Sequence, residues 1–395
     1  MNRLPVEQQG SASVRVASNT NPDTKVAIAE ILEELDAANA ALTLVFYGAC
    51  HDDLTIARTL EPVTGARGVA GTTAGELNSL GFSAQTMSGI SFHGSGVRAS
   101  VELLPQLKEL SLIPVVHLPE KLCRGIGRRK NELHPRRHLW LFLINGESGK
   151  EDLLTPFFMN AAPRVNLVGA TLADGTSGGA ARLVHDGRVY RDAAATILLE
   201  YDAPFEAFHN THVAMTQRRV EVTRVRRDGR HIMQFDGKPA LEAYAEALEL
   251  EPKEVTPAIL AMHPLGYRFR GQPFPISIGQ VGEEGSLRVA TTVQPGQKLQ
   301  ILDAQDLVTS SERCIDGVIE RVAPASDPNA LLDALLIFNC RMRHIEAAET
   351  GQLDALARAL CKGPVCGLNS NGEQFATMHL NHSMTGVAFG SSKPR

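Results

Sequence analysis

The sequence predicts an α/β protein with two related domains, each a mixed β-sheet with flanking helices, produced by an internal duplication. Three observations support this fold class. Uncharged segments of strand-forming residues recur along the chain, and each is followed by a helix-like stretch and a turn that contains glycine. The first and last of these units also share one residue spacing. A strand followed by a helix that returns the chain to the sheet is a βα unit. Since the pattern occurs about three times, we expect about three such units.

The first elements follow directly from composition. Residues 1–22 are polar and predict a flexible N-terminus, whereas residues 23–38 carry apolar side chains at helical spacing. Residues 42–48 read LTLVFYG, an uncharged run of strand formers ended by glycine, which is typical of a strand buried on both faces. Similar strand-like segments lie at 138–144 and 334–339, and helix-like stretches follow the three strands at 52–61, 151–160 and 344–360.

The duplication is visible in the turns that follow these helices. The turn at 69–76 ends in Glu76, the turn at 365–373 ends in Glu373, and a looser copy lies at 167–175. Beyond each glutamate, a methionine, a glycine and a phenylalanine follow at 11, 13 and 16 residues: Met87, Gly89 and Phe92, and Met384, Gly386 and Phe389. Three coincident offsets predict that 86–92 and 383–389 are the same strand in two copies.

A Tyr-Asp-Ala-Pro stretch at 201–204 predicts a boundary between two domains, 23–201 and 202–395. The second domain contains a segment without a counterpart in the first. Its expected elements are a strand at 211–225, a hairpin turn at 228–230, a return strand at 232–235, a helix at 236–248 and further strands within 258–304.

Composition excludes several classes of protein. The chain is 43% apolar with a net charge of −5, so it can bury a full core and gives no sign of a nucleic-acid or membrane partner. No apolar run approaches the ~20 residues that cross a bilayer, and the first residues lack the apolar stretch of a signal peptide. We therefore expect a cytoplasmic protein whose 6 cysteines are reduced thiols.

The common enzyme motifs are missing from the sequence. Residues 146–150, GESGK, resemble a phosphate-binding loop, but Ile144 stands where that loop needs glycine and Glu151 where it needs serine or threonine. No dinucleotide fingerprint, nucleophile elbow or HExxH motif occurs. We therefore expect the chain not to be an enzyme, the alternative being one that uses Cys340 or Cys366 as nucleophile.

Cysteine and histidine are concentrated near the C-terminus. Residues 340–382 hold three of the 6 cysteines and three of the 13 histidines: Cys340, His344, Cys361, Cys366, His379 and His382. Thiolates and imidazoles suit zinc, iron–sulfur clusters or haem iron, although no spacing matches a known zinc motif. The alternative is that these cysteines pack as small apolar residues while the histidines bond to backbone.

Two further features have both a structural and a functional interpretation. Glu76 and Glu373 could bind ligand or cap nearby backbone N–H groups, and their presence in both copies favours capping. Basic residues cluster at 124–138 and 218–230, where they form either solvated faces or a docking surface for an acidic partner.

Several motifs resemble the FIST family. Residues 69–92, VAGTTAGELNSLGF followed by MSGISF, resemble the turn and strand of the N-terminal FIST domain. Residues 367–390 resemble the ending of the C-terminal FIST domain, 235–248 its "LDGKPALE" helix, and 338–343, which include Arg341, its "FDCVLRR" strand end. The resemblance implies a FIST N-like domain at 23–201, a FIST C-like domain at 202–395, and a sensory role in signal transduction.

Within this family the chain resembles the NosP branch of stand-alone, nitric-oxide-sensing haemoproteins. That resemblance implies haem b as cofactor, nitric oxide as ligand, and a separate histidine kinase or cyclic-di-GMP enzyme as partner. His379 matches a histidine of the family's "MHVNQ" stretch and is the first candidate for iron ligand, followed by His382, His344 and Cys340. The alternative is a haem-free sensor of an amino acid or similar metabolite, with Glu76, Glu373 and Arg341 as candidate contacts.

Overall fold

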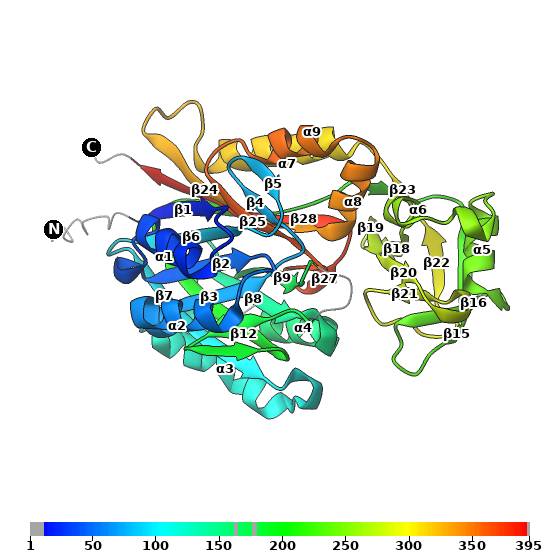
Figure 1. The fold of residues 1–395 in the computed structure, drawn as a ribbon, viewed down its shortest axis with the longest axis horizontal. Helices are drawn as coiled ribbons and strands as arrows, with labels where there is room; N and C mark the ends of the chain where they lie inside the picture. The colour runs from blue at the N-terminus through cyan, green and yellow to red at the C-terminus, as the bar shows by residue number, and fades with distance from the viewer. Residues whose placement is uncertain (1–11, 162–164, 176–179, 393–395) are drawn as a thin grey trace, which may run out of the picture.

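The computed structural model describes residues 12–161, 165–175 and 180–392, which fold as three copies of one unit and a β-rich insert (Figure 1). Each unit runs strand, helix, strand, helix, strand, hairpin and strand. The first unit comprises β1 (Ser13–Asn19), α1 (Thr24–Glu34), β2 (Leu42–Tyr47), α2 (Asp53–Thr64), β3 (Gly68–Thr72), the hairpin β4 (Glu76–Asn78) and β5 (Gly81–Ser83), and β6 (Met87–His93).

The other two units repeat this order. The second comprises β7 (Val97–Pro105), α3 (Leu112–Gly125), β8 (His138–Asn145), α4 (Glu151–Ala161), β9 (Asn166–Leu172), the hairpin β10 (Leu183–His185) and β11 (Arg188–Tyr190), and β12 (Ala193–Tyr201). The third comprises β13 (Phe205–Thr211), α7 (Leu307–Val322), β24 (Ala330–Cys340), α8 (Arg341–Glu349), α9 (Leu353–Leu360), β25 (Val365–Ser370), the hairpin β26 (Glu373–Phe375) and β27 (Met378–Leu380), and β28 (Ser383–Ser392).

The three units exchange their hairpins in a cycle. Hairpin β4–β5 of the first unit completes the sheet of the third, β10–β11 of the second completes that of the first, and β26–β27 of the third completes that of the second. The receiving strand is always the third strand of a unit: β25, β3 and β9. Each sheet therefore has six strands, four from one unit and two from another.

The register of the strands confirms the duplication and extends it to the second unit. In each unit the last strand lies between the first and second strands, and equivalent residues pair in the same way. The equivalent triplets are Ala17–Gly89–Val45, Glu102–Thr196–Phe142 and Phe208–Gly386–Ile337. Gly89 and Gly386 thus occupy equivalent positions, as the sequence offsets predict.

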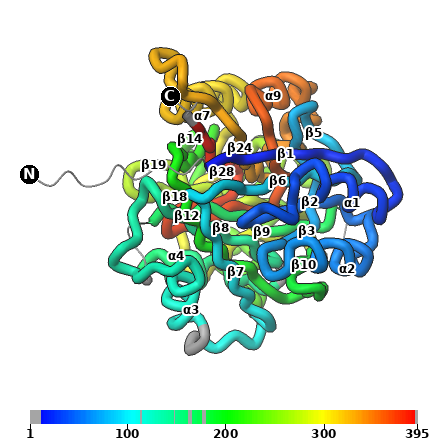
Figure 2. Tube along the Cα trace, turned by 90° about the vertical axis from the view of Figure 1, so that its left-hand side faces the viewer, coloured from blue at the N-terminus to red at the C-terminus, as the bar shows by residue number. Residues whose placement is uncertain are grey.

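The three sheets enclose one common core and carry their helices on the outside. Figure 2 shows the strands at the centre, with α1 and α2, α3 and α4, and α7 and α9 placed around them. The central core contains alternate residues of β2, β8 and β24, and separate apolar clusters lie under each helix layer. All residues of β2 and β8 are buried, which explains their uncharged sequences. This confirms the prediction that these strands are buried on both faces of the sheet.

Two local expectations from the sequence are wrong. Residues 13–19, predicted to be flexible, form the edge strand β1, which pairs with β6 and buries Val14 in the central core and Ala17 on the opposite face, in the cluster under α1. Residues 1–11 lie outside the described part of the chain. The helix expected at 344–360 is two helices, α8 and α9, and Gly351 between them adopts a positive φ of 68°.

The insert interrupts the third unit between β13 and α7 and has its own apolar core. A two-stranded ladder of β14 (Val213–Ala214) and β23 (Asp303–Ala304) forms its base. The other elements are β15 (Arg219–Val225), β16 (His231–Phe235), β17 (Lys238–Pro239), α5 (Ala240–Ala247), α6 (Pro257–Met262), β18 (Leu265–Phe269), β19 (Gln272–Ile276), β20 (Ile278–Val281), β21 (Leu287–Val289) and β22 (Lys298–Ile301).

Among the helices of the described residues, none has the length and apolar character needed to cross a membrane.

The glycine before each glutamate turn should be required for folding. Gly75 and Gly372 have φ values of 125° and 138°, and a Cβ on Gly75 would lie 3.0 Å from Nδ2 of Asn369. We expect Gly75→Val to lower the free energy of unfolding by ~1–3 kcal/mol, measured by urea denaturation. Gly279→Val is the control, since a Cβ there would meet only the backbone oxygen of Arg288, at an ordinary contact distance of 3.8 Å. Equal stability of the two variants would contradict the role of Gly75.

Candidate functional site

Glu76 and Glu373 occupy matching hydrogen-bond networks. Each is fully buried at the start of its hairpin. The carboxylate of Glu76 accepts hydrogen bonds from the hydroxyls of Thr73 and Thr86, and that of Glu373 accepts them from Ser370 and Ser383. In both copies one hydroxyl lies three residues before the glutamate and the other ten residues after it.

These networks give the two glutamates a structural role. Each carboxylate ties the entrance of a hairpin to the start of the strand that follows it, and the backbone N–H of Thr86 adds a third bond to Glu76, at 3.0 Å. Burial raises the pKa of Glu373 to about 7, against the opposing effect of its two serine bonds. A ligand could reach either carboxylate only by displacing these hydroxyls.

The other sequence candidates lie in different surroundings. His382 and Cys340 are buried near each other, and backbone N–H groups at 342 and 382 approach the Cys340 thiol. Both ring nitrogens of His382 lack a hydrogen-bond partner among the described residues. His344 packs edge-on against Phe82 with 4.9 Å between ring centroids, and Arg341 is exposed.

A buried arginine lies beside His382 and organises polar groups from three segments. Arg343 donates to Oδ1 of Asn339 at 2.9 Å and to Oγ of Ser311 at 2.6 Å, and it contacts Nδ1 of His212 at 3.0 Å. Nε2 of His212 lies 2.7 Å from Glu346, whose pKa burial raises to about 7. Burial and the Arg343 charge lower the pKa of both His212 and His382, so these imidazoles are neutral.

His379 lies apart from this network, at a junction of three parts of the molecule. Its Nδ1 is 3.1 Å from Oδ1 of Asp152 in α4, and Oδ2 of Asp152 accepts a hydrogen bond of 2.9 Å from Thr291 in the insert. Nε2 of His379 is buried without a hydrogen-bond partner among the described residues. A Cβ on Gly372 would collide with this nitrogen, so the imidazole occupies space that only glycine leaves free.

The equivalent residues of the other two hairpins are apolar. By strand pairing, His379 corresponds to Phe82 in the first hairpin and Val189 in the second. Phe82 packs on His344 of the neighbouring α8, in the same way that His379 meets Asp152 of the neighbouring α4. An imidazole is therefore present at only one of three equivalent positions, and the fold does not require it there.

Two carboxyl groups and one guanidinium surround His379. Arg230 of the insert lies 3.5 Å from Glu151 and 3.8 Å from Asp152. Burial raises the pKa of Glu151. For His379 burial has the opposite effect, but the Asp152 hydrogen bond and the Glu151 carboxyl outweigh it and raise the pKa above its ordinary value. The site thus pairs two carboxyl groups with an imidazole and a guanidinium.

A cavity of about 310 Å³ adjoins His379. Its walls are three aromatic rings of the insert, Tyr267, Phe269 and Phe274, together with Met378 and several threonines. This combination of an apolar wall and one oriented imidazole is typical of a small-ligand site. The sequence points to His379, but it gives no signal for Asp152 of the second unit or for the aromatic rings of the insert.

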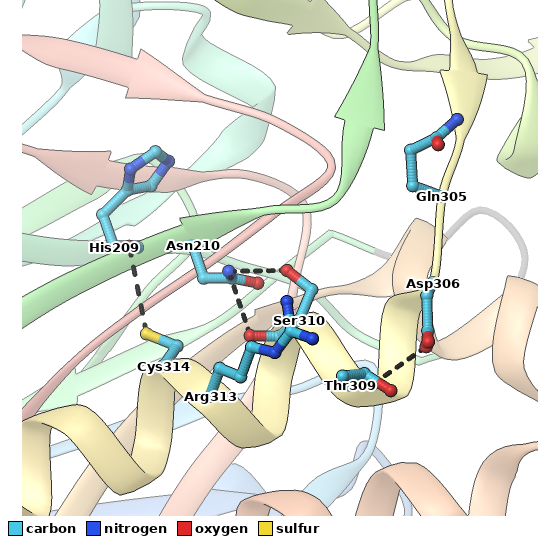
Figure 3. Close-up of a pocket in the computed structure, with 8 residues that line it drawn as sticks. All are labelled: His209, Asn210, Gln305, Asp306, Thr309, Ser310, Arg313 and Cys314. Atoms are coloured by element: carbon cyan, nitrogen blue, oxygen red, sulfur yellow. Dashed lines mark hydrogen bonds between the residues drawn. The ribbon is translucent and has the colours of Figure 1, made fainter.

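A larger hollow of about 610 Å³ lies along the first turns of α7 (Figure 3). Asn210 closes one side by donating to Oγ of Ser310 at 3.0 Å, and Arg313 lines the opening. Burial lowers the pKa of His209, also in this hollow, to about 4, so its ring is neutral, and it stacks on Phe375. None of the sequence candidates lines this hollow.

The reactivity of the cysteines and of the possible metal-ligating groups depends on their burial and their grouping. Burial raises the pKa values of Cys340 and Cys366 to about 12, which keeps both thiols protonated near neutral pH. Within 12–161, 165–175 and 180–392, no three His, Cys, Asp or Glu side chains are grouped so that they could hold a metal ion.

Comparison with known proteins identifies both halves of the chain. The FIST N domain model matches residues 41–238 and the FIST C domain model matches residues 240–376. No curated protein matches the chain. Among solved structures, a cyanuric acid hydrolase from A. caulinodans is similar with a TM-score of 0.36 and 9% identity, over 96% of this chain and 99% of that one.

The buried Glu373 should make stability depend on pH. Its pKa is 4.5 before burial and about 7 in the folded protein, so the folded state retains a proton that the unfolded state loses, and stability falls as pH rises through this window. Near pH ~5 the free energy of unfolding of Glu373→Gln should equal that of the wild type. Near pH ~8 it should exceed that of the wild type by up to ~3 kcal/mol.

Urea denaturation at the two pH values tests this expectation, with exposed Glu349→Gln as the control. A Glu373→Gln variant that is equally destabilised at both pH values would show that the ionised carboxylate holds the hairpin.

Proposed function

The chain belongs to the FIST family, whose domains are sensory domains of signal transduction, and from this premise we propose that it binds a small ligand beside His379 and signals to a separate protein. The observation that supports this site is the buried Nε2 of His379, which has no hydrogen-bond partner among the described residues and lies at the edge of a partly aromatic cavity. We further propose that the ligand system is haem b with nitric oxide, as the family resemblance implies.

The donor chemistry at His379 fits an axial haem ligand. Its Nδ1 faces Asp152, the arrangement that fixes ring orientation and increases the basicity of a metal-ligating imidazole. Haem, when bound, would supply an iron with an open position for a diatomic gas. The aromatic rings of Tyr267, Phe269 and Phe274 offer an apolar wall for a flat macrocycle.

There is too little space beside Nε2 of His379 for an iron atom in the present arrangement of the hairpin. Gly372 lies against that nitrogen, so the hairpin β26–β27 has to move before Nε2 can bind iron. The next candidates are less suited. His382 is fully buried beside Arg343, His344 packs against Phe82, and Cys340 carries a protonated thiol. His379 therefore remains the first candidate.

The metabolite alternative is less well supported by the side chains that it would use. Glu76 and Glu373 already bind hydroxyl groups of their own turns, and the exposed Arg341 lines neither cavity described above. A haem-free metabolite would instead have to use the cavity beside His379. A protein that stays colourless with hemin but binds a metabolite there would favour this alternative.

We propose a cytoplasmic protein without catalysis of its own, acting on a sensor histidine kinase or a cyclic-di-GMP enzyme. The basic segment 218–230 divides into two groups. Arg218 pairs with Asp303 and Arg230 with Glu151, whereas Arg226 and Arg227 are exposed at the β15–β16 turn. The exposed pair is our candidate contact for an acidic surface of the partner.

Replacing the proposed ligand residue tests the haem proposal. The wild-type protein reconstituted with hemin should show a Soret band that shifts under nitric oxide. His379→Ala should lose haem or change its ferrous and nitrosyl spectra, because an axial imidazole sets the ligand field, and added imidazole should restore the spectra in part. Absorption spectroscopy of the reconstituted proteins measures both effects.

His382→Ala serves as the comparison and should change these spectra much less. Wild-type spectra in His379→Ala would show that another residue ligates the iron. A wild-type protein that cannot be reconstituted with hemin would remove the haem proposal altogether.

Charge reversal at the exposed arginines tests the partner surface. Arg226→Glu combined with Arg227→Glu should slow association with the partner by ~10-fold or more, and added salt should weaken wild-type binding, because long-range attraction sets the encounter rate. Surface plasmon resonance gives the rates. Arg358→Glu, on the exposed side of α9, is the control, and equal rates for all proteins would make 226–227 an ordinary solvated turn.

A further inference from the structure

The insert, residues 215–302, is attached to the rest of the molecule at a narrow neck. Both of its chain connections pass through the short antiparallel ladder in which Val213 pairs with Ala304 and Ala214 with Asp303. Figure 1 shows the insert at one end of the molecule, beyond the three sheets. Apart from residues at the start of α8, the apolar core of the insert is formed by the insert itself, which is the condition for a rigid-body movement about this neck.

Two of the contacts between the insert and the rest of the molecule differ in character. Near the neck the contact is apolar, since Cys340 and Met342 at the start of α8 are part of the insert's own core. On the far side the contact is polar, formed by Arg230 and Thr291 against the start of α4. An apolar contact resists separation in water, whereas polar groups can exchange each other for water at small net cost. The arrangement therefore favours a hinge near α8 and an opening near α4.

The cavity beside His379 lies within the side that can open. Tyr267, Phe269 and Phe274 form its wall on the insert, and Met378 and His379 form its wall on the hairpin β26–β27. Between the two sides, Oδ1 of Asn381 accepts a hydrogen bond of 3.2 Å from a backbone N–H of the insert, at residue 277. Rotation of the insert away from α4 would take the aromatic wall with it and widen the cavity, which is partly open to solvent already.

Arg230 stabilises the closed arrangement because its guanidinium balances the charge of a buried carboxylate. Glu151 is 1% exposed, and its carboxylate lies 3.5 Å from the Arg230 guanidinium. The guanidinium also lies over Gly149, where a Cβ would be 3.3 Å from it. A buried carboxylate is stable as an ion only with a counter-charge, so closure of the insert and charge compensation of Glu151 occur together.

We propose that the insert is a hinged cap over the His379 cavity, latched by Arg230 and Thr291 against Glu151 and Asp152. The motion does not depend on the identity of the ligand, but its regulatory meaning rests on the ligand site proposed above. The latch residue Arg230 lies in the same β15–β16 turn region as Arg226 and Arg227. Opening of the cap would therefore displace the proposed partner surface as well as widen the cavity.

Hydrogen exchange of the ligand-free protein tests the cap directly. Arg230→Ala should speed amide exchange by about fivefold or more in residues 146–154 and 289–293, while β15, β16 and β22 keep wild-type protection. Thr291→Val, which removes one hydroxyl contact, should give a smaller change in the same segments. Arg219→Ala is the matched control, because Arg219 is exposed on β15 and forms no salt bridge within the described residues.

Two outcomes of this experiment would overturn the proposal. Unchanged exchange in Arg230→Ala would show that the insert is fixed by its other contacts. Lost protection throughout β15, β16 and β22 would show that Arg230 stabilises the fold of the insert instead of latching it.

Measurements with hemin distinguish the cap proposal from the haem proposal. If hemin binds, Arg230→Ala should speed both its uptake and its release to apomyoglobin by about fivefold, whereas Arg219→Ala should leave both rates unchanged. Wild-type hemin rates in Arg230→Ala would show that the cap does not gate the site. If no protein binds hemin, the haem assignment fails, while the exchange experiment still decides whether the cap opens.

Discussion

The exchange of hairpins between units is the constraint on which the structure depends. The third strand of every unit, β3, β9 or β25, has one edge that only a hairpin from another unit covers. Uncovered, these edges would leave backbone N–H and C=O groups without partners inside the protein. Since each unit both gives and receives a hairpin, no unit can complete its own sheet, and the three must fold together.

The direction of each hairpin is therefore set by the turn before it. In the first and third units a glycine with positive φ and a buried glutamate fix this turn, with hydroxyls on both sides of the glutamate. In the second unit strand pairing places Leu183 where the others have Glu76 and Glu373. The second turn is also longer, which explains why the sequence shows its copy as the looser one.

The sequence predicts the elements better than their pairing. Strands such as β2 and β8 are evident because burial on both faces requires uncharged residues, whereas β1 is only partly buried and its burial pattern does not alternate. The hairpin exchange is not predictable, since it pairs segments from different units. The site shows the same division: His379 stands out by residue type, but Asp152 reaches it from 227 positions away.

Closeness in sequence also misleads about the site. His379, His382, His344 and Cys340 form one cluster along the chain, yet in the structure only His382 and Cys340 remain near each other. His379 projects from a hairpin toward α4, and His344 projects from α8 toward Phe82. His382 occupies a turn position with φ of 46°, matching Gln85 with φ of 60° in the first unit. Gln85 is exposed, whereas His382 is fully buried.

The differences between the three units indicate how a repeated fold acquired one distinctive site. Three nearly equivalent hairpin positions hold Phe82, Val189 and His379, and the first two serve packing. Only the third unit contains the insert, whose residues reach both Asp152 and Asn381. The insert thereby brings an aromatic wall and a guanidinium to the one hairpin that carries an imidazole. A ligand held there would contact the hairpin β26–β27, α4 and the insert at once. Its binding energy could then favour one arrangement of these three parts over another. That is the physical requirement for a sensor, and the insert supplies it by breaking the symmetry of the three units.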